Sequence, residues 1–236
     1  MFMAFLDLTA ARPTEGYYTS EVRTPRSLPV RTFLPTGYEP RYPYPLLVFF
    51  HGHGGNEEQI LRLAPRLSRR NYISIGLRGP IPALSRNGEP DRYSWGGSAY
   101  VPLLEDYLVR AVLQTRRTYH VHSERIYLAG FGEGATLAYR LGLQLAGKVA
   151  GVISLNGAMP RERRPLLRLP EVRDLRVFIA HGIANSVVPL SLAQADCRLL
   201  ASAGVPVNLH TYPTNNRLHP HMLRDLNRWI IAGLEE

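Results

Sequence analysis

Four short segments contain the residues of this chain whose types and spacing could support chemistry. These segments are Phe-His-Gly-His-Gly-Gly at 50–55, Leu-Ala-Gly-Phe-Gly-Glu-Gly-Ala at 128–135, Ala-His-Gly-Ile-Ala-Asn-Ser-Val-Val-Pro at 180–189 and His-Thr-Tyr-Pro-Thr-Asn-Asn at 210–216. Glycines in the first segment allow backbone N–H groups to point at a ligand oxygen, where they stabilise developing negative charge. Glycines in the second relieve crowding in a sharp turn. We therefore expect a site that binds a carbonyl or carboxylate oxygen.

Each of these segments accompanies a predicted strand. Strands are predicted at 46–50, 72–75, 125–129, 149–155, 175–180 and 205–212, and helical apolar spacing follows at 56–67, 104–112, 134–146, 190–203 and 220–232. Alternation of this kind predicts an α/β fold with a mostly parallel sheet of about seven or eight strands and helices on both faces. In such sheets the ligand lies at the carboxyl ends of the strands, which is where these segments fall.

The chain is expected to form one domain, residues 1–236. Residues 1–29 contain three prolines and are predicted to be an irregular N-terminal arm. Residues 79–102 are rich in glycine and proline and are predicted to form a long loop over the cleft. That loop carries Tyr93 and Trp95, which either wall the cleft or pack within the loop; the sequence favours neither interpretation.

Taken in order, the segments resemble the motifs of the α/β-hydrolase superfamily, in its phospholipase/carboxylesterase ("predicted esterase") branch. Residues 128–135 resemble the G-x-S-x-G nucleophile elbow, 180–189 the segment that carries the triad acid, and 210–216 the turn that carries the triad histidine. The resemblance covers roughly residues 30 to 232. It implies an α/β-hydrolase fold and a family of carboxylic-ester hydrolases that use a serine nucleophile.

The catalytic triad, however, is degenerate. Aligned through the flanking residues, the nucleophile position holds Gly132, the acid position Asn185 and the histidine position Asn216. Glycine offers no oxygen or sulfur for attack, and asparagine has no group that titrates near neutral pH. We therefore predict a pseudo-hydrolase without serine-hydrolase chemistry, although the sequence leaves open whether the chain is an enzyme.

The binding half of the site is predicted to remain. The N–H of Glu133 at a helix start, and one from the region of His53, can still receive a carbonyl or carboxylate oxygen. The ligand would be a small molecule or a group on a protein partner. No cofactor is expected, and His51 and His53 have no third metal ligand nearby in the sequence, so no metal is expected either.

Two other functions stay open. Glu133 with His219 or His221 could activate water, which would make the chain a working ester hydrolase with relocated groups, although His219 also fits a cap of the last helix. A minor alternative is nucleotide binding, since Gly130-x-Gly132-x-x-Ala135 satisfies the dinucleotide fingerprint. The acid that this fingerprint needs is missing, because the next strand ends in Leu155-Asn156-Gly157.

Charge and composition exclude few classes of function or partner. The net charge is +9, and Lys148 is the only lysine beside many arginines, which cluster at 62–70 and 161–176. No aromatic-basic interleaving accompanies these clusters, so we expect solvated helix faces and no nucleic-acid partner. No apolar run approaches the roughly 20 residues that span a bilayer, and the protein is expected to be cytoplasmic. The sequence predicts no oligomeric state.

Overall fold

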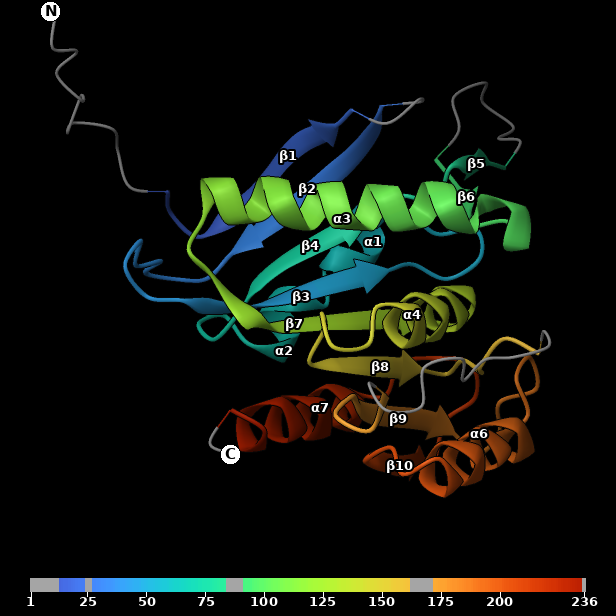
Figure 1. Ribbon diagram of the computed structural model, residues 1–236. Coiled ribbons are helices and arrows are strands. Elements are labelled where there is room, and N and C mark those ends of the chain that lie inside the picture. The colour runs from blue at the N-terminus through green and yellow to red at the C-terminus, as the bar shows by residue number, and fades with distance from the viewer. Residues whose placement is uncertain (1–12, 24–26, 84–90, 162–171, 235–236) are drawn as a thin grey trace, which may run out of the picture.

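The computed structural model describes residues 13–23, 27–83, 91–161 and 172–234. Eight strands form one sheet in the order β1-β2-β4-β3-β7-β8-β9-β10 (Figure 1). Their bounds are β1 (Gly16–Val22), β2 (Leu28–Leu34), β3 (Tyr44–Phe50), β4 (Ile73–Leu77), β7 (Val121–Phe131), β8 (Gly151–Leu155), β9 (Arg176–Gly182) and β10 (Val207–Tyr212). Neighbours pair in parallel from β4 to β10, whereas β2 pairs antiparallel with both β1 and β4. The predicted α/β class, with a mostly parallel sheet of seven or eight strands, is confirmed.

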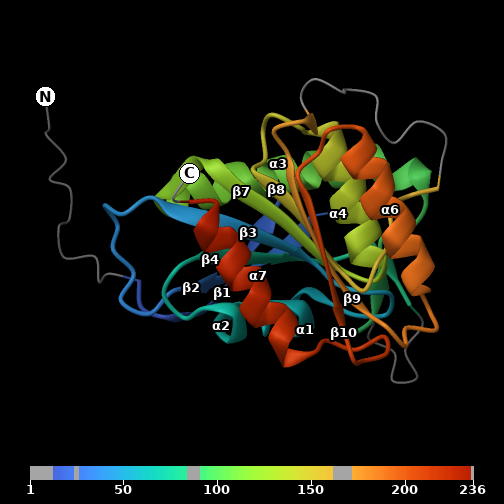
Figure 2. The ribbon, with the colours of Figure 1, turned by 90° about the horizontal axis from the view of Figure 1, so that it is seen from below.

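Helices cover both faces of the sheet. They are α1 (Glu57–Leu61), α2 (Ala64–Leu67), α3 (Val101–Thr118), α4 (Glu133–Gln144), α6 (Leu190–Ser202) and α7 (Pro220–Ala232). Seen from below, α3, α4 and α6 lie on one side of the strands, and α1, α2 and α7 on the other (Figure 2). Among the residues that the structure describes, no helix is both long and apolar enough to cross a membrane.

The central strand β3 explains why the sheet is buried on both faces. All seven of its residues are buried. Because successive side chains of a strand point to opposite faces, Leu46 and Val48 pack in the core under α3 and α4, while Leu47 and Phe49 pack in the core under α1, α2 and α7. An uninterrupted apolar run is the expected signature of such a strand.

The predicted single helix after β3 is divided into α1 and α2. Asn56 caps the first of them as predicted, because its Oδ1 accepts from Gln59 N at 2.9 Å. The interruption follows from Pro65 near the start of α2, since proline has no N–H to donate to the carbonyl four residues earlier.

The predicted irregular arm at residues 1–29 is wrong where β1 and the start of β2 lie. β1 runs antiparallel to β2, and Pro29 takes a position opposite Glu21. Prolines are poor strand residues because they cannot donate to a ladder, which is why the sequence suggested irregular chain. The alternating burial of β1 shows instead that one of its faces packs and the other is open. Residues 1–12 and 24–26 lie outside the described residues, so that part of the prediction stays untested.

The predicted loop at 79–102 contains more regular structure than expected. β5 (Ile81–Pro82) and β6 (Tyr93–Ser94) form a small antiparallel ladder, and a 3-10 turn at Ser98–Tyr100 leads into α3. Tyr93 also bridges to Gly55 in the glycine-rich segment after β3. The described part of this loop is therefore tied to the end of the sheet where the ligand was expected; residues 84–90 lie outside the described residues.

Candidate functional site

The predicted nucleophile elbow is a sharp turn between β7 and α4. Its apex is Gly132, with φ +54° and ψ −116°, a combination that costs a residue with a side chain backbone strain. The Gly132 N–H donates to Leu155 O at 3.0 Å, which holds the apex against the end of β8. A Cβ added to Gly132 would meet no atom within 4 Å. The elbow geometry is thus present, and the space for a side chain is open, but no nucleophilic atom stands there.

Close packing explains the neighbouring Gly134. A Cβ at this position would lie 2.3 Å from Phe50 O and 2.4 Å from His51 O. The first turn of α4 therefore sits directly against the end of β3, and only glycine permits that approach. This contact brings the glycine-rich segment after β3 and the start of α4 together.

The two asparagines at the acid and histidine positions meet. Asn185 follows β9 and Asn216 follows β10, and because these strands are parallel neighbours, their carboxyl ends lie side by side. Asn185 Nδ2 donates to Asn216 Oδ1 at 3.5 Å. Asn185 Oδ1 accepts from the N–H groups of Val187 and Val188, both at 3.0 Å. Asn185 thus accepts the backbone hydrogen bonds that an aspartate would accept. Towards Asn216, however, it presents an uncharged amide.

Asn156 is a buried residue that joins the loops of the site, and the sequence did not reveal its role. Its backbone N–H donates to Ala180 O at 2.9 Å, and its Oδ1 accepts from Gly182 N at 2.8 Å. Its Nδ2 donates to Arg217 O at 2.9 Å, next to Asn216. The φ of +55° fits an Asn-Gly pair after a strand, which was the available signal. Asn156 therefore fixes the end of β9 and the loop after β10 relative to β8.

Glu133 and His53 form a pair across the mouth of the site. His53 Nδ1 lies 3.2 Å from Glu133 Oε2, and the other oxygen, Oε1, accepts from Trp95 N at 3.2 Å. The His53 side chain is 81% exposed and the Glu133 side chain 28%. Within the described chain, the backbone N–H groups of His53 and Glu133 donate to no protein acceptor. The two predicted oxyanion donors are therefore available to a ligand, and the side-chain pair links the segments that carry them.

Trp95 does not wall the cleft, which corrects one of the two interpretations of this loop. Its side chain is 2% exposed and packs against the His51 ring, with 4.6 Å between centroids. A buried indole needs an acceptor, and Nε1 donates to His51 O at 2.8 Å. Tyr93 is half-buried, and the Arg78 guanidinium lies 4.7 Å from its ring centroid. The loop-packing interpretation therefore describes Trp95, which packs on the segment after β3, and Tyr93 packs against Arg78.

His51 is structural and neutral. Gly79 N donates to His51 Nε2 at 2.9 Å, so the ring proton is on Nδ1, which contacts Gly52 O at 2.8 Å. Burial lowers the pKa of His51, which agrees with the neutral form. Among the described residues, no group of three histidine, cysteine or acidic side chains is placed to hold a metal.

The relocated pair proposed from the sequence, Glu133 with His219 or His221, is not assembled. His219 Nδ1 accepts from His221 N at 3.3 Å and caps α7, and its ring stacks on Tyr212 at 5.9 Å between centroids. No hydrogen bond or ion pair within the described residues joins Glu133 to either histidine. The reason is that the Glu133 carboxylate turns towards the segment after β3, where it meets His53.

Comparison with known proteins decides the family. Residues 104–232, more than half of the chain, match the family described as Phospholipase/Carboxylesterase. The chain belongs to the phospholipase/carboxylesterase family. Acyl-protein thioesterase 1 of Mycosarcoma maydis is 35% identical over 116 residues, which cover 47% of this chain and 48% of that protein. The putative hydrolase MhqD of Bacillus subtilis (strain 168) is 23% identical over 190 residues, 78% of this chain and 91% of that one.

Solved structures share the fold of this phospholipase/carboxylesterase family member. A carboxylesterase from Mesorhizobium loti has a TM-score of 0.70 at 20% identity and covers 86% of this chain and 94% of its own. Acyl-protein thioesterase 2 of Zea mays has a TM-score of 0.67 at 17% identity, over 87% of this chain and 98% of its own. The match to the Mycosarcoma maydis thioesterase spans only about half of that protein's length. Family and fold are thus established, while activity and ligand depend on the site itself.

Proposed function

We propose that this member of the phospholipase/carboxylesterase family is a pseudo-hydrolase, which binds a ligand or partner at the ends of its strands without serine-hydrolase chemistry. The observation that carries the proposal is the contact of Asn185 with Asn216, together with the elbow at Gly132, which provides no nucleophilic atom. The acid and histidine positions of the triad contact each other, but both carry amide side chains, which do not exchange protons near neutral pH. Loss of such a triad costs on the order of a millionfold in turnover, and the remaining rate, about a thousandfold over water, is too small for ester turnover.

The proposed ligand presents a carbonyl or carboxylate oxygen to the N–H groups of His53 and Glu133. A neutral carbonyl suits the site better than a carboxylate, because the Glu133 carboxylate repels an anion. Two apolar side chains beside Asn185 are strongly exposed: Ile183 at 55% and Val187 at 68%. They supply an apolar rim for the rest of a small molecule or for the surface of a protein partner.

A second candidate function is supported by the His53–Glu133 pair itself. Because Glu133 contacts Nδ1, the other ring nitrogen of His53 is left to face a water molecule, and a carboxylate-oriented histidine is a competent general base. Such a site would hydrolyse an ester by direct attack of water, with the carbonyl oxygen held by the two free N–H groups. This candidate replaces the pairing of Glu133 with His219 or His221.

Ester turnover separates the two candidates. The full chain is assayed with p-nitrophenyl esters of increasing acyl length, beside the variants Glu133→Gln and His53→Gln. The pseudo-hydrolase predicts the same rate for all three proteins, indistinguishable from buffer. A rate well above buffer that both substitutions abolish would overturn this proposal and establish the second candidate.

Binding is tested separately by thermal shift. Small amides and ketones should raise the melting temperature, whereas alcohols of the same size, which have no carbonyl, should not. Equal shifts for the carbonyl compounds and the alcohols, or no shift with either, would remove the proposed oxygen-binding role. NAD and NADP serve as the check on nucleotide binding and are expected to have no effect, since Asn156 uses its side chain within the protein.

A further inference from the structure

A cavity lies away from the elbow, between the C-terminal half of α3, residues 123–128 of β7 and the turn after α4. Its volume is about 290 Å³, at the lower end of the usual size of small-molecule pockets. Its apolar lining includes Leu108, Val112, Ile126, Leu128, Leu145 and Val149. The candidate site and this cavity are at opposite ends of α4, whose 12 residues span about 18 Å. The cavity is therefore a distinct place and does not depend on the proposed function.

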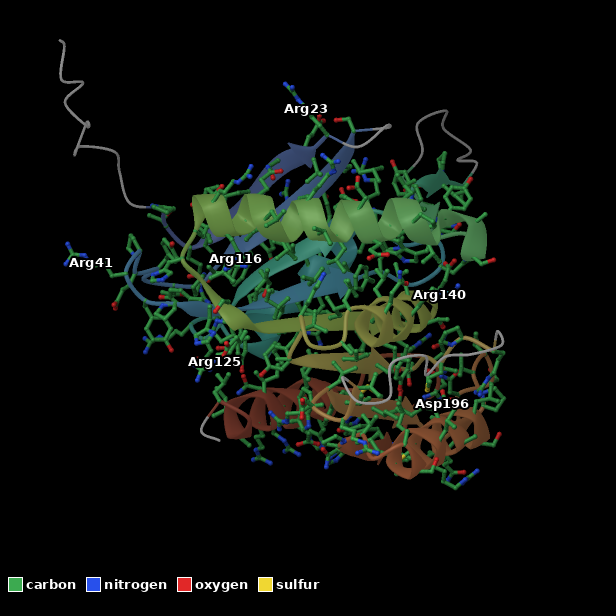
Figure 3. All side chains as sticks on the ribbon, in the orientation of Figure 1. Arg23, Arg41, Arg116, Arg125, Arg140 and Asp196 are labelled. Carbon is green, nitrogen blue, oxygen red and sulfur yellow. The ribbon has the colours of Figure 1, made fainter. Side chains whose placement is uncertain are left out.

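Polar groups gather at one end of this cavity. Arg116 from the last turn of α3, Ser123 from the start of β7 and Lys148 from the turn after α4 all line it. Figure 3 labels Arg116 on the side of α3 that faces β7. Arg116, Ser123 and Lys148 are exposed, and no ion pair within the described residues involves either cation. The opposite end is formed by Leu108 and Leu128, both buried.

Along both α3 and β7, the lining of this cavity changes from polar at one end to apolar at the other. Arg116 is eight residues, or about 12 Å, beyond Leu108 along α3. Ser123 precedes Leu128 by five residues on β7, which is about 16 Å along a strand. Val109 and Leu113, 39% and 45% exposed, extend the apolar surface along the α3 side. The cavity thus changes from cationic to apolar over the length of a medium alkyl chain.

The net charge at the polar end of the cavity follows from comparing the helix dipoles with the two cationic side chains. α3 and α4 both end near the cavity, and each helix C-terminus presents about half a negative charge. Arg116 and Lys148 contribute two full positive charges, which exceed that sum. An anionic group is therefore favoured there, and a guanidinium binds a carboxylate with two parallel hydrogen bonds.

We propose that this cavity binds an amphiphilic carboxylate of medium chain length, with its alkyl chain against Leu108 and Leu128 and its carboxylate between Arg116 and Lys148. The apolar chain contributes affinity by leaving water, and the two cations select the head group. Neither the elbow nor the pair of asparagines takes part in this binding.

The uniqueness of Lys148 makes a sharp test, because it is the only lysine of the chain. The full protein is treated with an amine-reactive reagent, and modification of Lys148 is followed by peptide mass spectrometry. Sodium decanoate, below the concentration at which it forms micelles, should slow the modification several-fold and saturably. Acetate, decanol and a decyl trimethylammonium salt should slow it much less.

Calorimetric titration with decanoate measures the contribution of the cations. Arg116→Met with Lys148→Met should weaken binding at least about tenfold, as expected for the loss of hydrogen bonds to a charged group. The matched control is Arg117→Met, since Arg117 is the next residue of α3 and does not line this cavity. Absence of saturable binding, equal protection by decanol, or equal losses in the double variant and the control would overturn the proposal. Protection that grows with protein concentration alone would also overturn it, because a second copy would then cover the cavity.

Discussion

At the scale of single residues, Gly132 adopts the backbone of a nucleophile elbow and provides no nucleophilic atom. Its φ of +54° opposes any side chain, yet a Cβ there would meet no atom. A substitution is therefore opposed only by backbone strain, which is typically about 1–3 kcal/mol for such outliers. Glycine at this position avoids that strain.

The first prediction concerns this strain. Gly132→Ala should lower the free energy of unfolding by about 1–3 kcal/mol, measured by urea denaturation. Gly97→Ala is the matched control: its Cβ also meets no atom, but its φ is −85°, so its stability should stay the same or rise by up to about 1 kcal/mol. Equal effects of the two substitutions would show that strain at the elbow is not stored in the backbone.

The second prediction concerns the chemistry that these positions can support. The triple variant Gly132→Ser, Asn185→Asp, Asn216→His should react covalently with a fluorophosphonate probe, because Asn185 and Asn216 already meet and the elbow has room for a serine. Gly132→Ser alone is the control and should stay unlabelled, since no base would activate its hydroxyl. A folded triple variant that the probe leaves untouched would count against our assignment of the three positions.

Residue identities at the site could be read from the sequence, but some pairings could not. Gly132, Asn185 and Asn216 follow from the motifs, and the parallel sheet brings the two asparagines together as its topology requires. His53 and Glu133 are 80 residues apart, and no local pattern indicates that one carboxylate turns towards the other segment. The decisive interaction there is a side-chain orientation, which only the packed structure fixes.

At the scale of elements, an ion pair joins the end of β4 to the start of α1. Arg78 Nε donates to Glu57 Oε2 at 2.7 Å, and its Nη2 contacts the other carboxylate oxygen. The Glu57 side chain is 4% exposed and that of Arg78 31%. Glu57 is also the first residue of α1, where the helix dipole favours a negative charge.

The third prediction tests this pair. Arg78→Met should lower the free energy of unfolding by about 3 kcal/mol, because it leaves a buried carboxylate without its partner. Arg69→Met removes the more exposed pair with Glu15 and should cost less than about 1 kcal/mol. Chemical denaturation of both variants gives the comparison, and similar losses would mean that the Glu57 carboxylate finds another partner or water.

Elements were predictable where an apolar run or a helix-starting proline marks them, and β1 was missed because it has neither. β3 is an unbroken apolar run, and α7 begins at Pro220 as predicted, because a proline fits the first turn of a helix. β1 combines tyrosine, threonine, serine and glutamate, so that only its alternation marks it as a strand. Its partner β2 contains a proline, which suggested an irregular chain until pairing with β1 was visible.

At the scale of the whole molecule, two buried histidines couple folding to pH. Burial lowers the pKa of His51 and of His181, so the folded protein holds both rings neutral. Below about pH 6.5 the two imidazoles of the unfolded chain bind protons, whereas the same rings in the folded protein stay neutral until the pH is lower. The stability that the neutral rings permit is therefore present above that pH and is lost as the pH falls.

The fourth prediction follows from this sign. The free energy of unfolding should be lower at pH 5 than at pH 7, and His51→Gln or His181→Gln should reduce the difference. Buried Asp196 opposes the trend in the acidic range: burial raises its pKa, so its contribution is lost as the pH rises from about 4. Urea denaturation of the parent protein and of both variants at several pH values makes the measurement, and a pH dependence that both substitutions leave unchanged would contradict the neutral state of the rings.

The bonds of Asn156 have a consequence for how this protein can change over time. They tie the loops after β8 and β10 to the end of β9 without using the side chains of the three triad-equivalent positions, so this spacing does not depend on the residue types at Gly132, Asn185 and Asn216. Substitutions at those three positions can therefore accumulate while the relative placement of the strand ends is kept. Introducing a serine, an aspartate and a histidine there would then be a matter of three exchanged side chains, with no refolding of the scaffold that presents them.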